Sequence, residues 1–159
     1  MVGDANKEVF LVKVTVRSGD TLWYYSQLFA IPIHLIIDSN LNLNINYLQV
    51  GATVNIPGFV LKQHKIVSGD TLWKLAKSRT LMADALFLVN PGIEAENLNV
   101  GQMIFIPERV VQPIVSGKRE YDFTDLWTDI EQLRTIYPFL QTRSIGKSVM
   151  GKDLIELRI

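Results

Sequence analysis

Cysteine is absent from this sequence and histidine is scarce, which limits the chemistry that the chain can perform. Without cysteine there is no disulfide bond and no thiolate ligand for a metal. The two histidines are His34 and His64, and Ile37 and Val67 stand where an H-x-x-E zinc-binding pair would need glutamate. No serine or cysteine nucleophile with a paired histidine can be argued either. We therefore expect no catalytic residue and no metal ligand within these 159 residues.

Net charge and long apolar runs are also missing. Sixteen acidic residues balance sixteen basic residues, so the formal net charge is zero. Nucleic acids and anionic membranes usually require a basic surface, so we expect neither as the main partner. The longest aliphatic stretches are too short to span a bilayer, and residues 1–10 do not have the pattern of a signal peptide. A neutral or mixed-charge partner such as a polysaccharide fits this composition.

One segment of the chain recurs fifty residues later. Residues 18–23 and 68–73 both read SGDTLW. The same offset, without a gap, aligns Asn40 with Asn90, Leu48 with Leu98, Gly51 with Gly101, and Ile56-Pro57 with Ile106-Pro107. The chain therefore contains two copies of a module of roughly 45 residues. Because so small a unit buries little surface, we expect most of its apolar residues to lie in its core.

Each copy is predicted to fold in the order strand, helix, helix, strand. In the first copy we expect a strand at 9–16, a helix with Leu22, Tyr25, Ser26 and Phe29 on one face, a helix from Pro32 to near Asn40, and a strand at 52–56 that Pro57 stops. In the second copy we expect a strand at 65–67, helices that bury Leu72, Leu75 and Ala76 and then Leu86 and Val89, and a strand at 103–106. Asp20 and Asp70 directly precede the first helices and are their expected N-caps.

The residues after 117 do not repeat. One helical face is predicted at Phe123, Leu126, Ile130, Leu133 and Tyr137, with Thr124 or Asp125 as its cap. Two strands are predicted at 142–145 and 154–159, around a turn at 146–151. Because nothing covers the last strand, we expect this region to begin a larger domain. The predicted division is a flexible N-terminus (1–8), two modules (9–58 and 64–108) with a linker between them (59–63), a second linker (109–117) and the third region (118–159).

The two copies resemble lysin motif (LysM) modules. The resemblance is carried by V-x-S-G-D-T-L-W at 16–23, I-V-S-G-D-T-L-W at 66–73, Asn40, Asn90-Pro91-Gly92, and L-x-V-G-x-x-x-x-I-P at 48–57 and 98–107. It implies an α+β chain of two tandem βααβ modules that bind N-acetylglucosamine-containing polymers, either peptidoglycan or chitin.

The third region resembles the beginning of a zinc carboxypeptidase-like domain, an α/β fold. The carrying residues are Tyr121-Asp122-Phe123, Asp129, Ile130, Leu133, Tyr137-Pro138, 145–148 and 151–154. Paired lysin motifs before such a domain resemble bacterial γ-D-glutamyl-L-diamino acid endopeptidases, which cut the peptide stems of peptidoglycan and are tied to sporulation. The resemblance implies a location at the cell wall or spore. It also implies that zinc belongs to a longer parent protein, with no cofactor in this chain.

An acetylated amino sugar offers amide groups, hydroxyl groups and a methyl group, so its capture needs a shallow groove with exposed backbone polar groups and an apolar floor. Tight turns before the helices and the loops opposite them would supply both. The expected glycan-binding residues are Gly19, Asp20, Thr21, Leu22, Asn42, Leu43 and Asn44 in the first copy, and Gly69, Asp70, Thr71, Leu72, Pro91, Gly92, Ile93 and Glu94 in the second.

Several of these residues also have a purely structural interpretation. Asp20 and Asp70 can cap a helix while the loop they fix binds sugar, and Asn40 and Asn90 can brace a loop. Trp23 and Trp73 either pack over the module edge or stack on a sugar face. Because Leu41 replaces Pro91 and Arg79 replaces Phe29, we expect the two grooves to bind unequally, with the second the more family-like.

Three functions remain open at this point. The first is a wall-binding region that targets an attached stem-peptide hydrolase. The second is a zinc endopeptidase whose catalytic residues lie beyond Ile159. The third is a non-catalytic spore-coat protein whose modules bind another protein.

Overall fold

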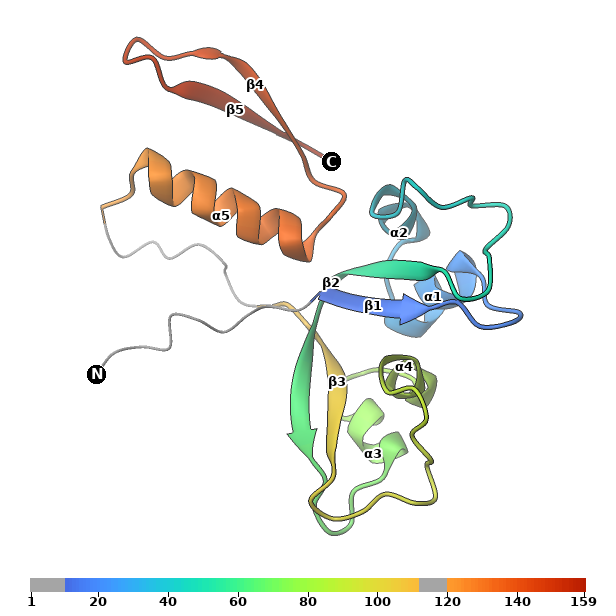
Figure 1. The fold of residues 1–159 in the computed structure, drawn as a ribbon. Helices are drawn as coiled ribbons and strands as arrows, with labels where there is room; N and C mark the ends of the chain where they lie inside the picture. Colours follow the sequence, from blue (N-terminus) through green and yellow to red (C-terminus); the bar gives the residue numbers. More distant parts are fainter. Residues whose placement is uncertain (1–10, 112–119) are drawn as a thin grey trace.

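The computed structural model describes residues 11–111 and 120–159, and the predicted flexible N-terminus at 1–8 lies outside them. Figure 1 shows two small helix-and-strand modules and a separate helix with a hairpin. The first module contains β1 (Leu11–Thr15), α1 (Leu22–Phe29), α2 (Ile33–Asp38) and the start of β2 (Thr53–Lys65). The second contains the end of β2, α3 (Leu72–Lys77), α4 (Ala83–Val89) and β3 (Met103–Arg109). The third region contains α5 (Phe123–Ile136), β4 (Gln141–Lys147) and β5 (Asp153–Arg158).

Strand β2 belongs to both modules, which corrects the linker predicted at 59–63. Its first part pairs antiparallel with β1, and its second part pairs antiparallel with β3 from Phe59 to Lys65. The prediction that Pro57 ends the strand was wrong because a bulge accommodates it. Val12 pairs with Ile56 and Leu11 pairs with Val60, so residues 57–59 have no partner on β1. Proline has no backbone N–H to donate, and at position 57 none is required.

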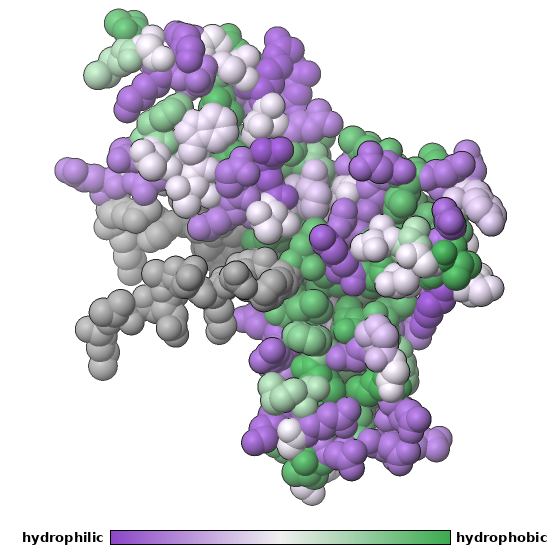
Figure 2. Space-filling model, in the orientation of Figure 1, coloured by the Kyte–Doolittle hydropathy of each residue, from purple (hydrophilic) through white to green (hydrophobic). Residues whose placement is uncertain are grey.

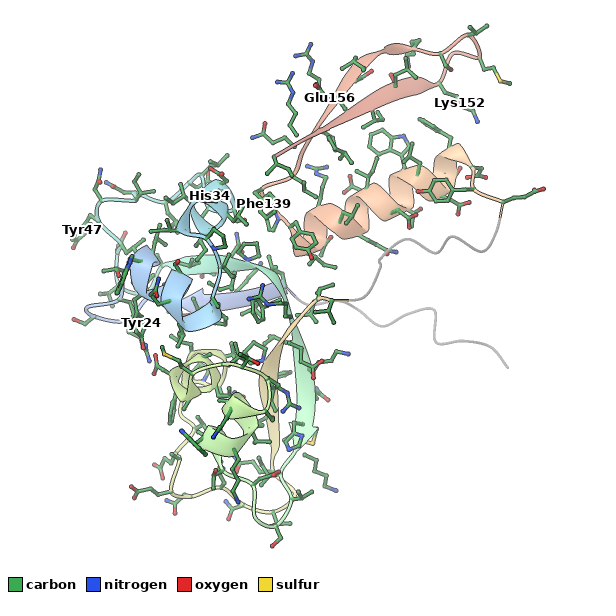
Figure 3. All side chains as sticks on the ribbon, turned by 180° about the vertical axis from the view of Figure 1, so that it is seen from behind. Tyr24, His34, Tyr47, Phe139, Lys152 and Glu156 are labelled. Carbon is green, nitrogen blue, oxygen red and sulfur yellow. The ribbon has the colours of Figure 1, made fainter. Side chains whose placement is uncertain are left out.

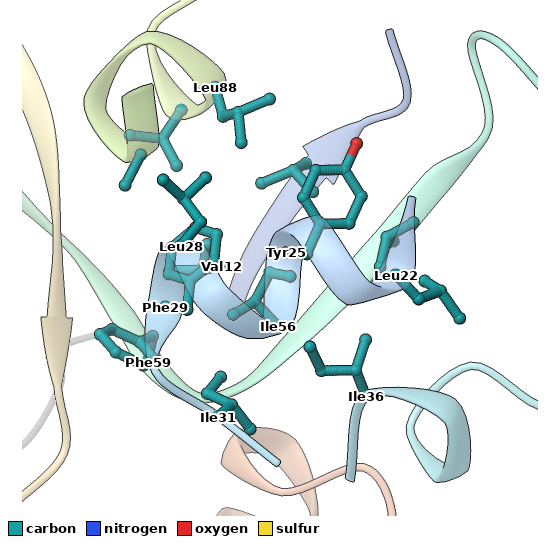
Figure 4. Close-up of a cluster of buried hydrophobic side chains, with 14 of the residues drawn as sticks. Val12, Leu22, Tyr25, Leu28, Phe29, Ile31, Ile36, Ile56, Phe59 and Leu88 are labelled. Carbon is teal, nitrogen blue, oxygen red and sulfur yellow. The ribbon is translucent and has the colours of Figure 1, made fainter. Parts of the chain in front are cut away.

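The two modules also share a hydrophobic core. The larger cluster of buried side chains joins β1, α1, α2 and β2, and it includes Ala85, Leu88 and Val89 from α4 of the second module (Figure 4). Phe29 and Phe59 meet edge to face there, with ring centroids 5.4 Å apart. The second module keeps a smaller cluster, formed by Ile66, Leu72, Leu75, Ala76, Leu86, Ile104 and Ile106. The modules are therefore packed against each other rather than strung on a linker.

Threonine, not aspartate, caps the first helix of each module. Thr21 accepts the backbone N–H of Tyr24 at 3.0 Å, and Thr71 accepts that of Lys74 at 3.1 Å. Asp20 and Asp70 stand one residue too early, where their carboxylates reach back to the preceding turn. The repeat thus places a turn-bracing aspartate before a capping threonine.

The third region has the predicted helix and antiparallel hairpin. Asp122 caps α5 and Asp125 completes a capping box, so the cap expected at Thr124 or Asp125 lies two or three residues earlier in the chain. Strands β4 and β5 pair from Gln141 with Arg158 to Lys147 with Asp153. The hairpin tip exposes Val149 and Met150, and Figure 2 shows hydrophobic residues at that end of the molecule.

A small cavity of about 120 Å³ lies where the third region meets the first module. It is lined by Ile31, Pro32, Leu35, Pro57, Gly58, Arg109, Val110, Tyr137 and Phe139. The Arg109 guanidinium lies over the Phe59 ring and donates to the carbonyl oxygens of Phe29 and Ala30, so it closes the end of α1. None of the residues expected to bind glycan lines this cavity.

Candidate glycan-binding sites

The predicted sites are built from two loops in each module. We call residues 18–21 with residues 42–45 the first site, and residues 68–71 with residues 92–95 the second site. In the first site, the Asp20 N–H donates to the Arg17 carbonyl at 3.2 Å and closes a tight turn. Gly19 stands in this turn with a φ of +86°, and Gly69 has a φ of +87° in the equivalent turn. Glycine is therefore required by the backbone conformation itself.

The turns expose polar backbone, and the leucine that follows each turn is buried beneath it. Gly19, Thr21, Gly69 and Thr71 are exposed, whereas Leu22 and Leu72 are buried in the two cores. The second turn is partly occupied, because the Lys74 ammonium donates to the Gly69 carbonyl at 2.8 Å. The repeat places Tyr24 at the equivalent position of the first turn, and its hydroxyl points elsewhere. The Leu22 and Leu72 side chains are therefore core floor rather than exposed contacts.

Two tryptophans stand beside the turns with their rings exposed. Trp23 is 64% exposed and Trp73 is 61% exposed. Such exposed rings can stack on the face of a sugar, and this interpretation is favoured over packing against the edge of the module. The Lys77 ammonium lies 4.6 Å from the Trp73 ring centroid, so a cation covers one face of that ring.

The second wall of each site is a loop fastened by asparagine. The Asn40 side-chain amide donates to the Ile36 and Asn55 carbonyls, and its oxygen accepts the Asn55 N–H at 2.8 Å. Asn90 makes the same three bonds, to Leu86 and Phe105. The bracing role predicted for both asparagines is confirmed.

The loops after these asparagines follow the same path although their sequences differ. Leu43 donates its N–H to Asn40, and Ile93 donates to Asn90. Asn42 and Asn44 are exposed with Leu43 half-buried between them, and Pro91, Gly92 and Glu94 are exposed around a half-buried Ile93. The sequence differences therefore change side chains rather than backbone. Leu41, Ile45 and Tyr47 are exposed on the first loop, where Figure 3 shows Tyr47 projecting outward.

Both walls of a site lie at the same end of their module. In the first module, Gly51 and Val16 are joined by a backbone hydrogen bond of 2.8 Å, which ties the end of the loop to the strand before the turn. Gly101 and Ile66 make the same bond in the second module. Leu43 packs against the core that contains Leu22. In each module the loop therefore returns to the strand before the turn, and a residue of the loop packs on the core that the leucine after the turn also enters.

The aspartates of the two turns are held by different neighbours. Burial alone would raise the pKa of Asp20, but hydrogen bonds from Arg17 and Tyr25 outweigh it and lower that pKa. Asp70 accepts the Val67 N–H, which lowers its pKa, and it pairs with His64 at 2.9 Å. Both carboxylates are therefore held as anions that brace the turn.

Comparison with known proteins agrees with the division into two modules. The sequence model of the LysM domain matches residues 14–57 and 64–107. The chain belongs to the LysM domain family. It is 43% identical over 146 residues to gamma-D-glutamyl-L-diamino acid endopeptidase 1 of Lysinibacillus sphaericus, a match that covers 92% of this chain and 37% of that protein. It is 30% identical over 102 residues to the probable peptidoglycan endopeptidase LytE of Bacillus subtilis strain 168, covering 57% of this chain and 30% of that protein.

This LysM chain spans about a third of the length of these curated relatives. A solved structure of the spore cortex-lytic enzyme SleL of Bacillus megaterium QM B1551 is 27% identical, with a TM-score of 0.34, over 64% of this chain and 24% of that one. Within the described ranges, no group of three or more potential metal-ligating side chains was found. No helix in the described part of the chain has the length and apolar character needed to cross a membrane.

Sequence reasoning missed a polar cluster between the modules. Arg17, Tyr24 and Asp84 meet there, with Arg17 bonded to Asp84 at 2.6 Å and 3.0 Å. A signal was present, because the repeat has Val67 and Lys74 at the positions of Arg17 and Tyr24. These two positions, at which the charge differs between the copies, thus lie at the contact between the modules.

Proposed function

We propose that the two sites bind an N-acetylglucosamine-containing polymer of the bacterial cell wall, namely peptidoglycan. The observation that carries this proposal is the duplicated pair of loops, which exposes backbone polar groups over an apolar core in both modules. Such a surface matches the amide, hydroxyl and methyl groups of an acetylated amino sugar. Peptidoglycan is favoured over chitin by the relative named as a probable peptidoglycan endopeptidase.

Each site alone should bind with modest affinity. The free energy gained from each hydrogen bond to the sugar is only slightly larger than the free energy needed to remove water from the bonded groups. Two sites on one chain raise the apparent affinity when a glycan strand, or two neighbouring strands, reaches both. Because the modules share β2 and a core, the spacing of the sites is set by packing. This fixed spacing selects polymers in which sugars recur at the matching distance.

We further propose that the chain targets an attached hydrolase to the wall or spore. The 43% identity to the endopeptidase extends over 146 residues, which is more than the two matched LysM segments contain. The similarity therefore includes sequence outside the modules, as expected if residues 118–159 begin a zinc carboxypeptidase-like domain. In this proposal, zinc would be held by residues of a longer protein.

The test is sedimentation of the chain with purified peptidoglycan, with and without N-acetylglucosamine oligomers as competitors. We expect the chain to sediment, the oligomers to release it, and no stem peptide to be cleaved. A chain that stays in the supernatant would contradict wall binding. Sedimentation that the oligomers leave unchanged, together with capture by a coat protein, would favour the alternative of a protein partner. Cleavage by these residues alone would contradict the targeting role.

A further inference from the structure

A residue of the second module braces the turn of the first site. We propose that Asp84, on α4, is a positioning residue for the first site, so that this site reaches full affinity only when the second module is docked against it. This inference rests on the proposed glycan binding. In this proposal, the glycan affinity of the first site depends on a residue of the second module, whereas the affinity of the second site does not depend on the first module.

The Arg17 guanidinium lies between two carboxylates. Asp84 accepts from Arg17 Nη1 at 3.0 Å and from Nη2 at 2.6 Å, a bidentate pair. Asp20 accepts from Arg17 Nε at 3.1 Å and from the Arg17 backbone N–H at 3.0 Å. Because a guanidinium is planar and rigid, fixing one edge on Asp84 fixes the edge that Asp20 meets. Asp20 belongs to the turn, so the second module helps to set the turn's geometry.

We call the chain of contacts Asp84–Arg17–Asp20 the brace. Asp84 is itself held in place by contacts with both modules. The Tyr24 hydroxyl donates to Asp84 at 2.7 Å, and Figure 3 shows Tyr24 on the side of the first module that faces the second. Asp84 lies in the first turn of α4, where the helix dipole favours a carboxylate. Ala85 and Leu88 on the same helix are buried in the shared core. Asp84 is therefore carried by a packed helix rather than by a free surface segment.

The second site has a brace of its own and supplies an internal control. Asp70 accepts the Val67 N–H at 3.0 Å and pairs with His64 at 2.9 Å, and both partners belong to the second module. The residue equivalent to Asp84 in the first module is His34, which is exposed on α2. Loss of Asp84 should thus be felt at the first site and not at the second.

The experiment is an NMR titration of the full 159-residue chain with chitotetraose, following the amides of Gly19 and Thr21 for the first site and Gly69 and Thr71 for the second. In D84N, we expect the dissociation constant of the first site to rise by about threefold to tenfold, while that of the second is unchanged. D84E keeps the carboxylate and should restore most of the affinity. D38N removes an exposed aspartate of α2 and should change neither site.

Three results would overturn the inference. The first is an unchanged dissociation constant of the first site in D84N, and the second is an equal loss of affinity at both sites in D84N. The third is a loss of affinity at the first site that persists in D84E. If the wild-type Gly19 and Thr21 amides do not respond to chitotetraose, the first site is not glycan-binding and the proposed function fails there. Hydrogen exchange of the Asp20 amide then tests the brace without ligand, and it should be faster in D84N than in wild type. Equal exchange would refute the brace itself.

Discussion

Replacing Asn40 by alanine should destabilise the protein far more than replacing any exposed asparagine of the same loop. Asn40 is 6% exposed and makes three hydrogen bonds, to the Ile36 carbonyl and to the carbonyl and N–H of Asn55. A net contribution of about 1 kcal/mol for each gives about 3 kcal/mol for the three. For a chain of this length that loss lowers the melting temperature by roughly 6–12 °C.

The assay is urea unfolding followed by circular dichroism, with Asn42→Ala as the matched control. Asn42 is exposed on the same loop, so its replacement should change the free energy of unfolding by less than about 0.5 kcal/mol. Asn90→Ala should fall between the two, because Asn90 makes the equivalent bonds but is less buried. If Asn40→Ala costs no more than the control, asparagine does not fasten the loop and the description of the second wall is wrong.

Three other predictions test the shared core, the turn and the ion pairs. Leu88→Ala should cost about 2–5 kcal/mol in urea unfolding and shift amide signals of the first module, since Leu88 packs in that core; changes confined to the second module would contradict this. Gly19→Ala should cost about 1–2 kcal/mol because of its positive φ, whereas Ser18→Ala should not; equal melting temperatures of both variants would refute the strained turn. Hydrogen bonds from Arg17 are the main reason why the pKa values of Asp20 and Asp84 are lowered in the folded protein. The two carboxylates therefore stabilise the fold at pH values above their unfolded-state pKa of about 3.9. This stabilisation is lost as the pH falls below that value and through the lower folded-state pKa values. Urea unfolding of D84N should therefore lose less stability between pH 5 and pH 2 than wild type, and identical slopes would count against the ion pair.

The repeat predicted most of the fold within each module. Leu22, Tyr25, Ser26 and Phe29 are all buried on α1, because a spacing of three and four residues places them on one helical face. The same periodicity placed α5, although Tyr137, predicted on its apolar face, is the C-cap rather than a helical residue. These features depend on local pattern, which a single sequence displays.

What the sequence did not predict depends on contacts between distant residues. Pro57 is an ordinary strand terminator, but a bulge opposite Val12 lets β2 continue into the second module. Asp84 and Arg17 are 67 positions apart, and no local pattern links them. The copies also differ at Arg17, Tyr24 and Asp84, and these three residues form a polar contact that joins the modules.

The central claim is that the turn and the facing loop of each module bind an acetylated amino sugar. The most direct test is to titrate the wild-type chain with chitotetraose while recording the amide signals of Gly19, Thr21, Gly69, Thr71 and Gly92. Saturable shifts confined to these loops are predicted. If neither set of loops responds at any sugar concentration, the chain does not bind N-acetylglucosamine polymers through these surfaces.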